Sequence, residues 1–312
     1  MGYTRWCERN ASMNTVASVL CPIDFSDPSR AALRYAAAIA GHFGARLTML
    51  AVDDPLLAEA AANSGLAVPL ADETMRELQH VAAETIAMPA GGAPAIDFKV
   101  RTGKPGIEIL AQARETAAGL IVMSSRGQTG IRKMFFGSTA ERVLRETPAP
   151  VLVTSPEQPP PGSLEDVGRH VKRVLAPVDL TPASSRQLTV AAGIAHALAL
   201  PLLVAHIVEP VVIPMRVRMA MGGADAARRS AAADQLADAA ASIPDAVKSE
   251  TMILSGDPAE EIVKLTETRR ANLIVMGLHS SELFGPRMGS VTYRVLSLTR
   301  ALVLALPPAA QP

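Results

Sequence analysis

The sequence predicts an α/β protein of two repeated doubly wound domains, each a mostly parallel five-stranded sheet with helices on both faces. The chain has 312 residues, which corresponds to two domains at about 150 residues per domain. One sequence unit occurs twice, and in each unit short, apolar, β-branched runs alternate with helical stretches. This alternation is typical of a parallel sheet covered on both faces, with right-handed crossovers between its strands.

The repeat is clearest in the apolar run that opens each unit. The run 18–26, SVLCPIDFS, recurs at 173–181 as RVLAPVDLT, and both contain the pattern Pro-x-Asp-x-Ser/Thr. The further matches are 101–105 with 254–258, 120–123 with 273–276, and Gly137-Ser138 with Gly289-Ser290. The offset drifts from 155 to 152 positions, which a few loop insertions or deletions would produce. We therefore expect two diverged copies of one domain.

The matches and the proline content predict the segment boundaries. An N-terminal tail covers 1–15 and the first domain covers 16–155. A Pro-rich linker covers 156–171, because three consecutive prolines from Pro159 fit neither a helix interior nor a central strand. The second domain covers 172–308.

Within the first copy, strands and helices alternate in order along the chain. The expected strands are Val16–Ile23, Leu47–Val52, Asp97–Arg101, Leu120–Ser124 and Val151–Thr154. The expected helices are Ser29–Phe43, Asp72–Ala87, Gly106–Ala118 and Ser138–Glu146. The last strand of each copy, at 151–154 and 302–305, is apolar and would lie at a sheet edge, where an uncovered apolar strand invites pairing.

Composition excludes several classes of protein. Thirty basic and thirty acidic residues leave no net charge, so a nucleic-acid partner is not expected. The apolar runs are far shorter than the ~20 residues that a membrane span needs, and no signal-peptide core follows the N-terminus, so we expect a cytoplasmic protein without a membrane partner. The six histidines and two cysteines show no metal-ligand spacing, and no Walker-type Gly-x4-Gly-Lys-Ser/Thr motif is present.

Candidate binding residues follow the strands, because ligands of a doubly wound sheet bind beyond the carboxyl ends of the strands. Asp24 and Ser26 follow the first strand, the glycine-containing stretch 124–130 follows the fourth, and Gly137-Ser138-Thr139 opens a helix. Backbone N–H groups at glycines and at a helix N-terminus bind anions without a charged side chain. A carboxylate at Asp24 can accept hydrogen bonds from a ribose or a base edge. An adenine nucleotide is therefore the expected ligand.

A capping role is the alternative for each of these residues. Taken singly, a Gly-Ser pair that opens a helix, or an Asp-x-Ser after a strand, is more often only a helix cap. The two motifs occur together at matching strand ends in both copies. That combination favours a binding site.

The repeated chain resembles the universal stress protein family in its tandem two-domain form. The ATP-binding signature of the family is Gly-x2-Gly-x9-Gly-Ser/Thr after the fourth strand, joined to an Asp two residues after a proline on the first strand. The first copy matches it with Pro22, Asp24, Ser124, Gly127, Gly137 and Ser138. The one departure is Ser124, where the family prefers glycine.

The second copy departs further from this signature. Its matching residues are Pro177, Asp179, Gly277, Gly289 and Ser290. Ser280 replaces the second glycine, the loop is one residue shorter, and Glu282 adds a negative charge near the expected phosphates. The first copy is therefore expected to be the better nucleotide site.

The resemblance implies further contacts and a function. Val52 and Ile207 would meet adenine through backbone atoms, Met123 precedes the glycine loop, and Thr139 joins Ser138 at the phosphates. ATP is the implied cofactor, and Asp24 could help to hold Mg²⁺. The implied function is that of an ATP-binding, nucleotide-dependent stress-response regulator. The alternatives are a slow ATPase and a nucleotide-free structural or interaction protein. Hydrolysis is not assigned, because no general base or metal-ligand set is evident. By the same resemblance, the edge strands pair the two domains within one chain or form a homodimer.

Overall fold

The computed structural model describes residues 16–63, 69–86, 94–125, 137–155, 161, 164–210, 224–278 and 289–308. The tail expected at 1–15 lies outside these ranges. In the first copy the elements are β1 (Ser18–Pro22), α2 (Asp27–Phe43), β2 (Arg46–Asp53), α3 (Pro55–Asn63), α4 (Leu70–Thr85), β3 (Ile96–Thr102), α5 (Pro105–Glu115), β4 (Leu120–Ser124), α6 (Ser138–Glu146) and β5 (Val151–Thr154).

The second copy repeats this order after a short connecting helix. Its elements are α7 (Leu164–His170), β6 (Val174–Pro177), α8 (Ser184–Ala197), β7 (Leu202–Val208), α10 (Ala224–Ala240), β8 (Ser249–Ser255), α11 (Pro258–Thr268), β9 (Leu273–Gly277), α12 (Ser290–Leu298) and β10 (Leu302–Leu306). Helix α7 lies inside the segment that we expected to be linker.

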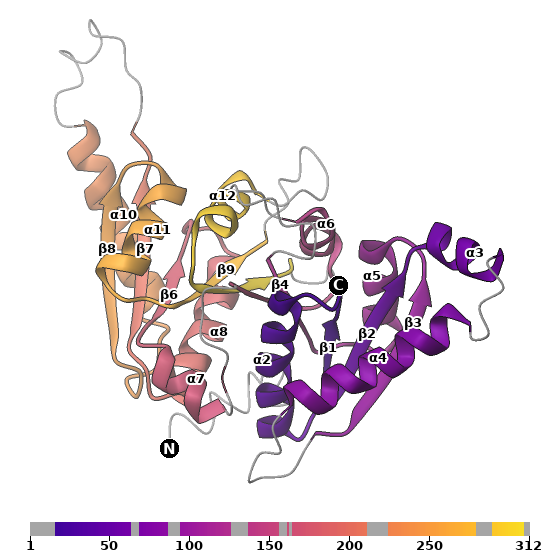
Figure 1. The fold of residues 1–312 in the computed structure, drawn as a ribbon. Helices are drawn as coiled ribbons and strands as arrows, with labels where there is room; N and C mark the ends of the chain where they lie inside the picture. Colours follow the sequence, from indigo (N-terminus) through magenta and orange to yellow (C-terminus); the bar gives the residue numbers. More distant parts are fainter. Residues whose placement is uncertain are drawn as a thin grey trace, which may run out of the picture.

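The strands form one ten-stranded sheet in the order β3-β2-β1-β4-β5-β10-β9-β6-β7-β8. Within each copy every neighbouring pair is parallel, which confirms the predicted α/β fold of two doubly wound halves. The halves join through an antiparallel pair in which Val303 of β10 lies opposite Val153 of β5. Figure 1 shows the first copy in indigo to magenta and the second in pink through orange to yellow, side by side.

Local sequence explains where α2 begins and ends. The hydroxyl of Ser26 accepts a hydrogen bond from Ser29 N at 3.3 Å and so caps the helix. A proline follows in the first turn, where its missing N–H is not needed. The helix stops at Gly44, whose φ of 62° is the left-handed conformation that glycine adopts without strain.

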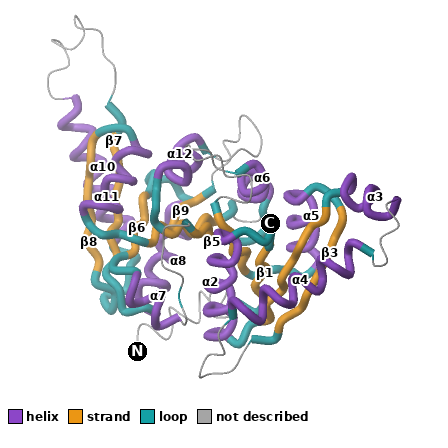
Figure 2. Tube along the Cα trace, in the orientation of Figure 1, coloured by secondary structure: helices purple, strands orange, loops and turns teal. Residues whose placement is uncertain are grey.

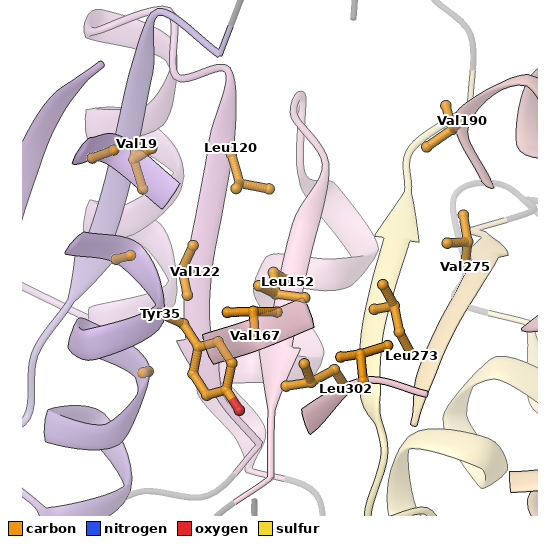
Figure 3. Close-up of a cluster of buried hydrophobic side chains, with 14 of the residues drawn as sticks. Val19, Tyr35, Leu120, Val122, Leu152, Val167, Val190, Leu273, Val275 and Leu302 are labelled. Carbon is orange, nitrogen blue, oxygen red and sulfur yellow. The ribbon is translucent and has the colours of Figure 1, made fainter. Parts of the chain in front are cut away.

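The helices cover both faces of the sheet, as Figure 2 shows. On one face α2, α4, α7, α8 and α10 contribute to one hydrophobic core. On the other face α5, α6, α11 and α12 contribute to a second core. Each core contains residues of both copies. Figure 3 shows Leu152 of the first copy close to Leu302 of the second. The two copies are therefore packed as one body.

No helix of the described ranges combines the length and the apolar character that a membrane span requires.

Candidate functional site

The strand order places the expected site residues at one edge of the sheet. Strand β1 lies between β2 and β4 and is parallel to both. The residues at their carboxyl ends, Asp24, Val52 and Ser124, therefore lie on neighbouring strands. This is the point where the strand order reverses direction, which is where doubly wound sheets bind ligands. The second copy places Asp179, Ile207 and Gly277 in the same way around β6.

Asp24 is exposed and sits in a turn between β1 and α2. Its Oδ1 accepts hydrogen bonds from Ser26 N at 3.1 Å and from Ser26 Oγ at 2.5 Å. Between them, Phe25 has a φ of 64°, which is uncommon for a residue other than glycine. The carboxylate therefore holds the turn, and Ser26 is a helix cap as the alternative interpretation proposes.

The second copy repeats the turn, and a serine of α8 also donates to its carboxylate. Asp179 Oδ1 accepts from Thr181 N at 3.0 Å, from Thr181 Oγ1 at 2.7 Å and from Ser184 Oγ at 2.9 Å. Leu180 has a φ of 60°, matching Phe25. The Asp179 carboxylate is thus held by its own turn and by the start of α8.

The apolar members of the expected site differ in exposure. Met123 is 6% exposed and Ile207 8%, and both belong to the core between the sheet, α5, α6, α11 and α12. Val52 is half-buried and packs against the same core. Their side chains therefore serve packing, and any adenine contact at Val52 or Ile207 would use backbone atoms. Pro22 and Pro177 end β1 and β6 in corresponding positions.

The expected phosphate end is the N-terminus of α6. Gly137 is the N-cap, with φ −65° and ψ 137°, and its N–H donates to Ser125 O at 3.1 Å. Ser138 is exposed and Thr139 half-buried in the first turn. Within the part of the chain that the structure describes, no side chain caps this helix. Its first backbone N–H groups are therefore suited to an anion.

Gly137 is not required by the packing of the chain itself. A Cβ at this position would lie 3.6 Å from Ser125 O, an ordinary contact, and the φ of −65° suits any residue. Gly289 is the N-cap of α12 in nearly the same conformation, with φ −55° and ψ 145°, and Ser290 follows it. Gly127, Ser280 and Glu282 lie outside the described residues.

The residues at this edge offer few ligands for Mg²⁺. Mg²⁺ sites commonly combine one or two carboxylates with phosphate oxygens and water. Asp24 offers a carboxylate here, with one of its oxygens already engaged by Ser26. Across the described ranges, no three His, Cys, Asp or Glu side chains gather into a metal site. The chain by itself therefore does not define a Mg²⁺ site, and nucleotide oxygens would have to supply further ligands.

Two polar contacts near this edge were not predicted from the sequence. Asp53, at the end of β2, is 8% exposed and accepts a hydrogen bond at 2.8 Å from Thr74 Oγ1 of α4, itself 7% exposed. The carbonyl of Asp53 accepts from Gly103 N at 3.0 Å. These bonds fix the end of β2 to α4 and to the end of β3.

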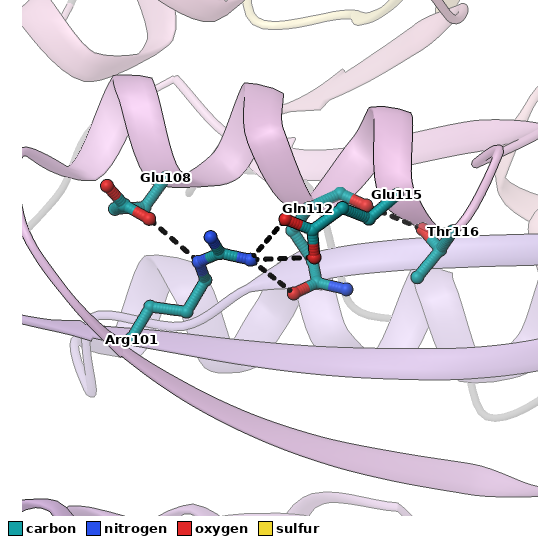
Figure 4. Close-up of polar contacts among 5 residues, drawn as sticks. All are labelled: Arg101, Glu108, Gln112, Glu115 and Thr116. Atoms are coloured by element: carbon teal, nitrogen blue, oxygen red, sulfur yellow. Dashed lines mark hydrogen bonds and ion pairs between the residues drawn. The ribbon is translucent and has the colours of Figure 1, made fainter.

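The other contact joins β3 to α5, as Figure 4 shows. Arg101 donates from Nε to Glu108 at 2.7 Å and from Nη1 to Glu115 at 2.8 Å and to Gln112 at 3.3 Å. The hydrogen bonds to Glu115 and then Glu108 raise the pKa of Arg101 above its ordinary value. The spacing of seven residues between the two glutamates places them on one helix face, and this is the signal that could have found the cluster.

Comparisons with known proteins agree with this geometry. The model of the Universal stress protein family matches residues 16–155 and 170–307. A universal stress protein of Mycolicibacterium smegmatis is 25% identical over 299 residues, which make up 94% of this chain and 98% of that protein. The Thermus aquaticus universal stress protein in the QAH/OAS sulfhydrylase 3′ region is 31% identical over 140 residues, which are 44% of this chain and 96% of that protein.

A solved structure establishes the shared fold over nearly the whole chain. The crystal structure of a universal stress protein from Archaeoglobus fulgidus aligns with a TM-score of 0.61 at 20% identity, covering 95% of this chain and 98% of that one. Fold and site thus define a tandem pair of doubly wound domains, each with an Asp turn and a Gly-Ser helix start at its carboxyl edge. The chain belongs to the universal stress protein family, because the family model matches both copies.

Proposed function

We propose that this protein binds ATP, chiefly in its first copy, and acts as a nucleotide-dependent regulator of a stress response. The observation that carries the proposal is the carboxyl edge of the first copy. There Asp24 follows β1, and β1 lies between β4 and β2, the strand that carries Val52. Strand β4 leads to the α6 N-terminus, where no described side chain caps the helix. Family membership supports the same function.

Each residue has a role in this proposal that its position allows. Asp24 accepts hydrogen bonds from the ribose, and the backbone at Val52 meets adenine. Gly137, Ser138 and Thr139 present N–H and hydroxyl groups to the phosphates. Gly127 is assigned to the phosphates by the family motif alone, because it lies outside the described residues.

The first copy is the preferred ATP site, because in the second copy the corresponding groups already form hydrogen bonds within the chain. Asp179 Oδ1 already accepts from Ser184 Oγ, whereas Ser29, at the corresponding position of the first copy, donates to Ser26 O at 2.9 Å. The Thr292 hydroxyl of α12 donates to Gly277 O at 3.3 Å, whereas the first copy has Ala140 at the position of Thr292. A ligand in the second copy would have to compete with these bonds.

Two further parts of the proposal concern setting and assembly. We place the protein in the cytoplasm, where ATP is abundant. The β5–β10 pair makes the two copies one working unit. Mg²⁺ binds together with the nucleotide, whose oxygens supply part of its ligands.

Isothermal titration of the full chain with ATP tests the proposal. We expect the wild type to bind, and Gly137→Val to lose binding while remaining folded, because the added side chain blocks the approach of phosphate and not the packing of the chain. The matched control is Gly289→Val, which makes the same change in the second copy and is expected to keep the principal binding event.

The outcomes separate the alternatives. No ATP binding by the wild type would contradict the proposal and leave the nucleotide-free interaction protein. If ATP binds, phosphate release by the wild type above the level of Gly137→Val would assign the slow ATPase instead of a regulator that only binds.

A further inference from the structure

The helix start next to α6 carries opposite charges in the two copies. Helices α5 and α11 occupy corresponding places, because each follows the matched stretch 101–105 or 254–258. The N-cap of α11 is Asp257, whereas the N-cap of α5 is Lys104. The following helix carries an arginine at the same position in both copies, Arg142 in α6 and Arg294 in α12.

In the second copy these groups neutralise one another. Asp257 caps α11 by accepting from Glu260 N at 3.0 Å, and its other oxygen accepts from Arg294 Nη1 at 2.5 Å. Glu260 accepts from Arg294 Nη2 at 3.3 Å. The hydrogen bond from Arg294 holds the pKa of Asp257 below its ordinary value. The arginine of α12 is therefore fully engaged by the start of α11.

In the first copy the arginine has no such partner. Arg142 lies against the start of α5, where a Cβ added to Gly106 would come within 2.9 Å of its Cδ. Its Nε is buried and donates no hydrogen bond within the described residues, and it forms an ion pair at 3.5 Å with Glu146 Oε1 of the same helix. Lys104 is exposed, and within the described ranges its side chain forms no ion pair and does not cap α5.

This arrangement is unfavourable for the chain alone. A lysine at a helix N-terminus is repelled by the partial positive charge of the exposed N–H groups, where an acidic or hydroxyl side chain is usual. Lys104, Arg142 and the N-terminus of α5 thus bring positive charge to the start of α5, while the first turns of α5 and α6 also carry Glu108 and Glu141. An anion placed against the three positive groups would be stabilised by them.

We propose that Lys104 and Arg142 bind the terminal phosphates of the nucleotide whose first phosphate lies at Gly137 and Ser138. The inference rests on the proposed function and adds ligand selection to it: the first copy distinguishes nucleoside triphosphates from monophosphates. The second copy cannot make this distinction, because Asp257 occupies the place of the ligand anion.

The change Lys104→Asp tests the proposal by rebuilding the second-copy pair inside the first copy. The new aspartate can cap α5 and accept from Arg142, so we expect a higher melting temperature. The affinity for ATP, measured by isothermal titration of the full chain, should fall roughly ten- to a hundredfold, because charge-assisted hydrogen bonds are lost and an acid is added. The affinity for AMP should change less than about twofold, because its single phosphate stays at α6.

Two further variants separate charge from packing. Lys104→Gln removes the charge without adding an acid, and its ATP affinity should lie between those of the wild type and Lys104→Asp. Asp257→Lys makes the reciprocal change in the second copy. It should lower the melting temperature, since a cap and an ion pair are lost, and leave the principal ATP affinity as in the wild type.

The outcomes are distinguishable from failure of the proposed function. If the wild type binds no ATP, the proposed function is wrong and this inference falls with it. If the wild type binds ATP and Lys104→Asp binds it equally well, the inference alone is wrong. Lys104 would then only be a residue that leaves α5 without a side-chain cap. An equal loss of ATP and AMP affinity would also overturn it.

Discussion

Two buried threonines in the first copy use their hydroxyls differently. Thr74, 7% exposed, donates to the carboxylate of Asp53 at 2.8 Å. Thr154, at the end of β5, is 1% exposed, and its hydroxyl has no hydrogen-bond partner in the described structure. Burying an unpaired hydroxyl costs free energy, whereas a paired one is close to neutral or favourable.

Replacing Thr154 by valine should therefore stabilise the protein. Valine has nearly the same shape and suits a strand, so we expect the free energy of unfolding to rise by about 1 kcal/mol. Chemical denaturation with the midpoint and slope fitted together measures the change. A lower midpoint at unchanged slope would show that the hydroxyl has a partner in solution.

Thr74→Val is the matched control, because it deletes a hydroxyl that is paired. It leaves the buried Asp53 without its donor, and the free energy of unfolding should fall by about 1–3 kcal/mol.

At the residue scale, the sequence predicted motif residues better than the contacts around them. Asp24, Gly137 and Ser138 lie at strand ends and at a helix start as expected, because such places depend on local chain order. The Asp53–Thr74 bond spans 21 positions, and Arg142 and Arg294 differ in the partners that their own and the preceding helix supply. Contacts of this kind depend on packing between elements, which one sequence does not specify.

At the scale of elements, strongly patterned segments were predicted within a few residues. Strands β4 and β5 and helix α6 have the predicted bounds, and α2 begins two residues earlier than predicted because Ser26 caps it. Helices α3 and α7 were not predicted. Helix α3 buries no side chain and leaves Leu56 76% exposed, so it lacks the apolar face that signals a helix. Helix α7 is only seven residues long and follows a run of prolines.

The ion pair between α11 and α12 gives an element-scale prediction with a pH dependence. Asparagine caps a helix about as well as aspartate, so Asp257→Asn removes mainly the charge that Arg294 contacts. At neutral pH the wild type should be the slightly more stable protein, because an exposed ion pair contributes little to the free energy of unfolding. Thermal unfolding of both proteins across a pH series measures the difference.

The sign of this dependence follows from the lowered pKa. The folded-state pKa of Asp257 lies below the ordinary value of 3.8, so its contribution is fully present above 3.8. The contribution is lost as the pH falls through the folded-state value. The two unfolding curves should therefore converge in acid, and a difference that persists at low pH would assign the effect to capping instead of charge.

At the scale of the whole molecule, the two copies share both hydrophobic cores. Leu152 and Val167 pack in one cluster with Leu273 and Leu302, so no apolar boundary separates the halves. The β5–β10 pair continues the backbone hydrogen bonding across the junction. The internal repeat, visible in the sequence, thus predicted two domains, and the structure joins them into one sheet.

Shared cores predict a single cooperative unfolding transition for the full chain. Scanning calorimetry should give a calorimetric enthalpy close to the van't Hoff enthalpy. Leu175→Ala, at a fully buried position of the second copy, should lower the free energy of unfolding by about 2–5 kcal/mol. It should move the whole transition to lower temperature. Two transitions, with only one of them shifted, would show that the copies unfold independently.

The antiparallel junction also fixes the direction in which each half faces. All strands of one half run parallel, and β10 opposes β5, so the carboxyl ends of β1 to β5 and of β6 to β10 point in opposite directions. The two Asp turns and their Gly-Ser helix starts therefore lie on opposite edges of one sheet, out of reach of each other's ligand. A partner that contacts one edge detects whether the site on that edge holds a ligand. A signal between the edges would have to cross the shared sheet and the two hydrophobic cores.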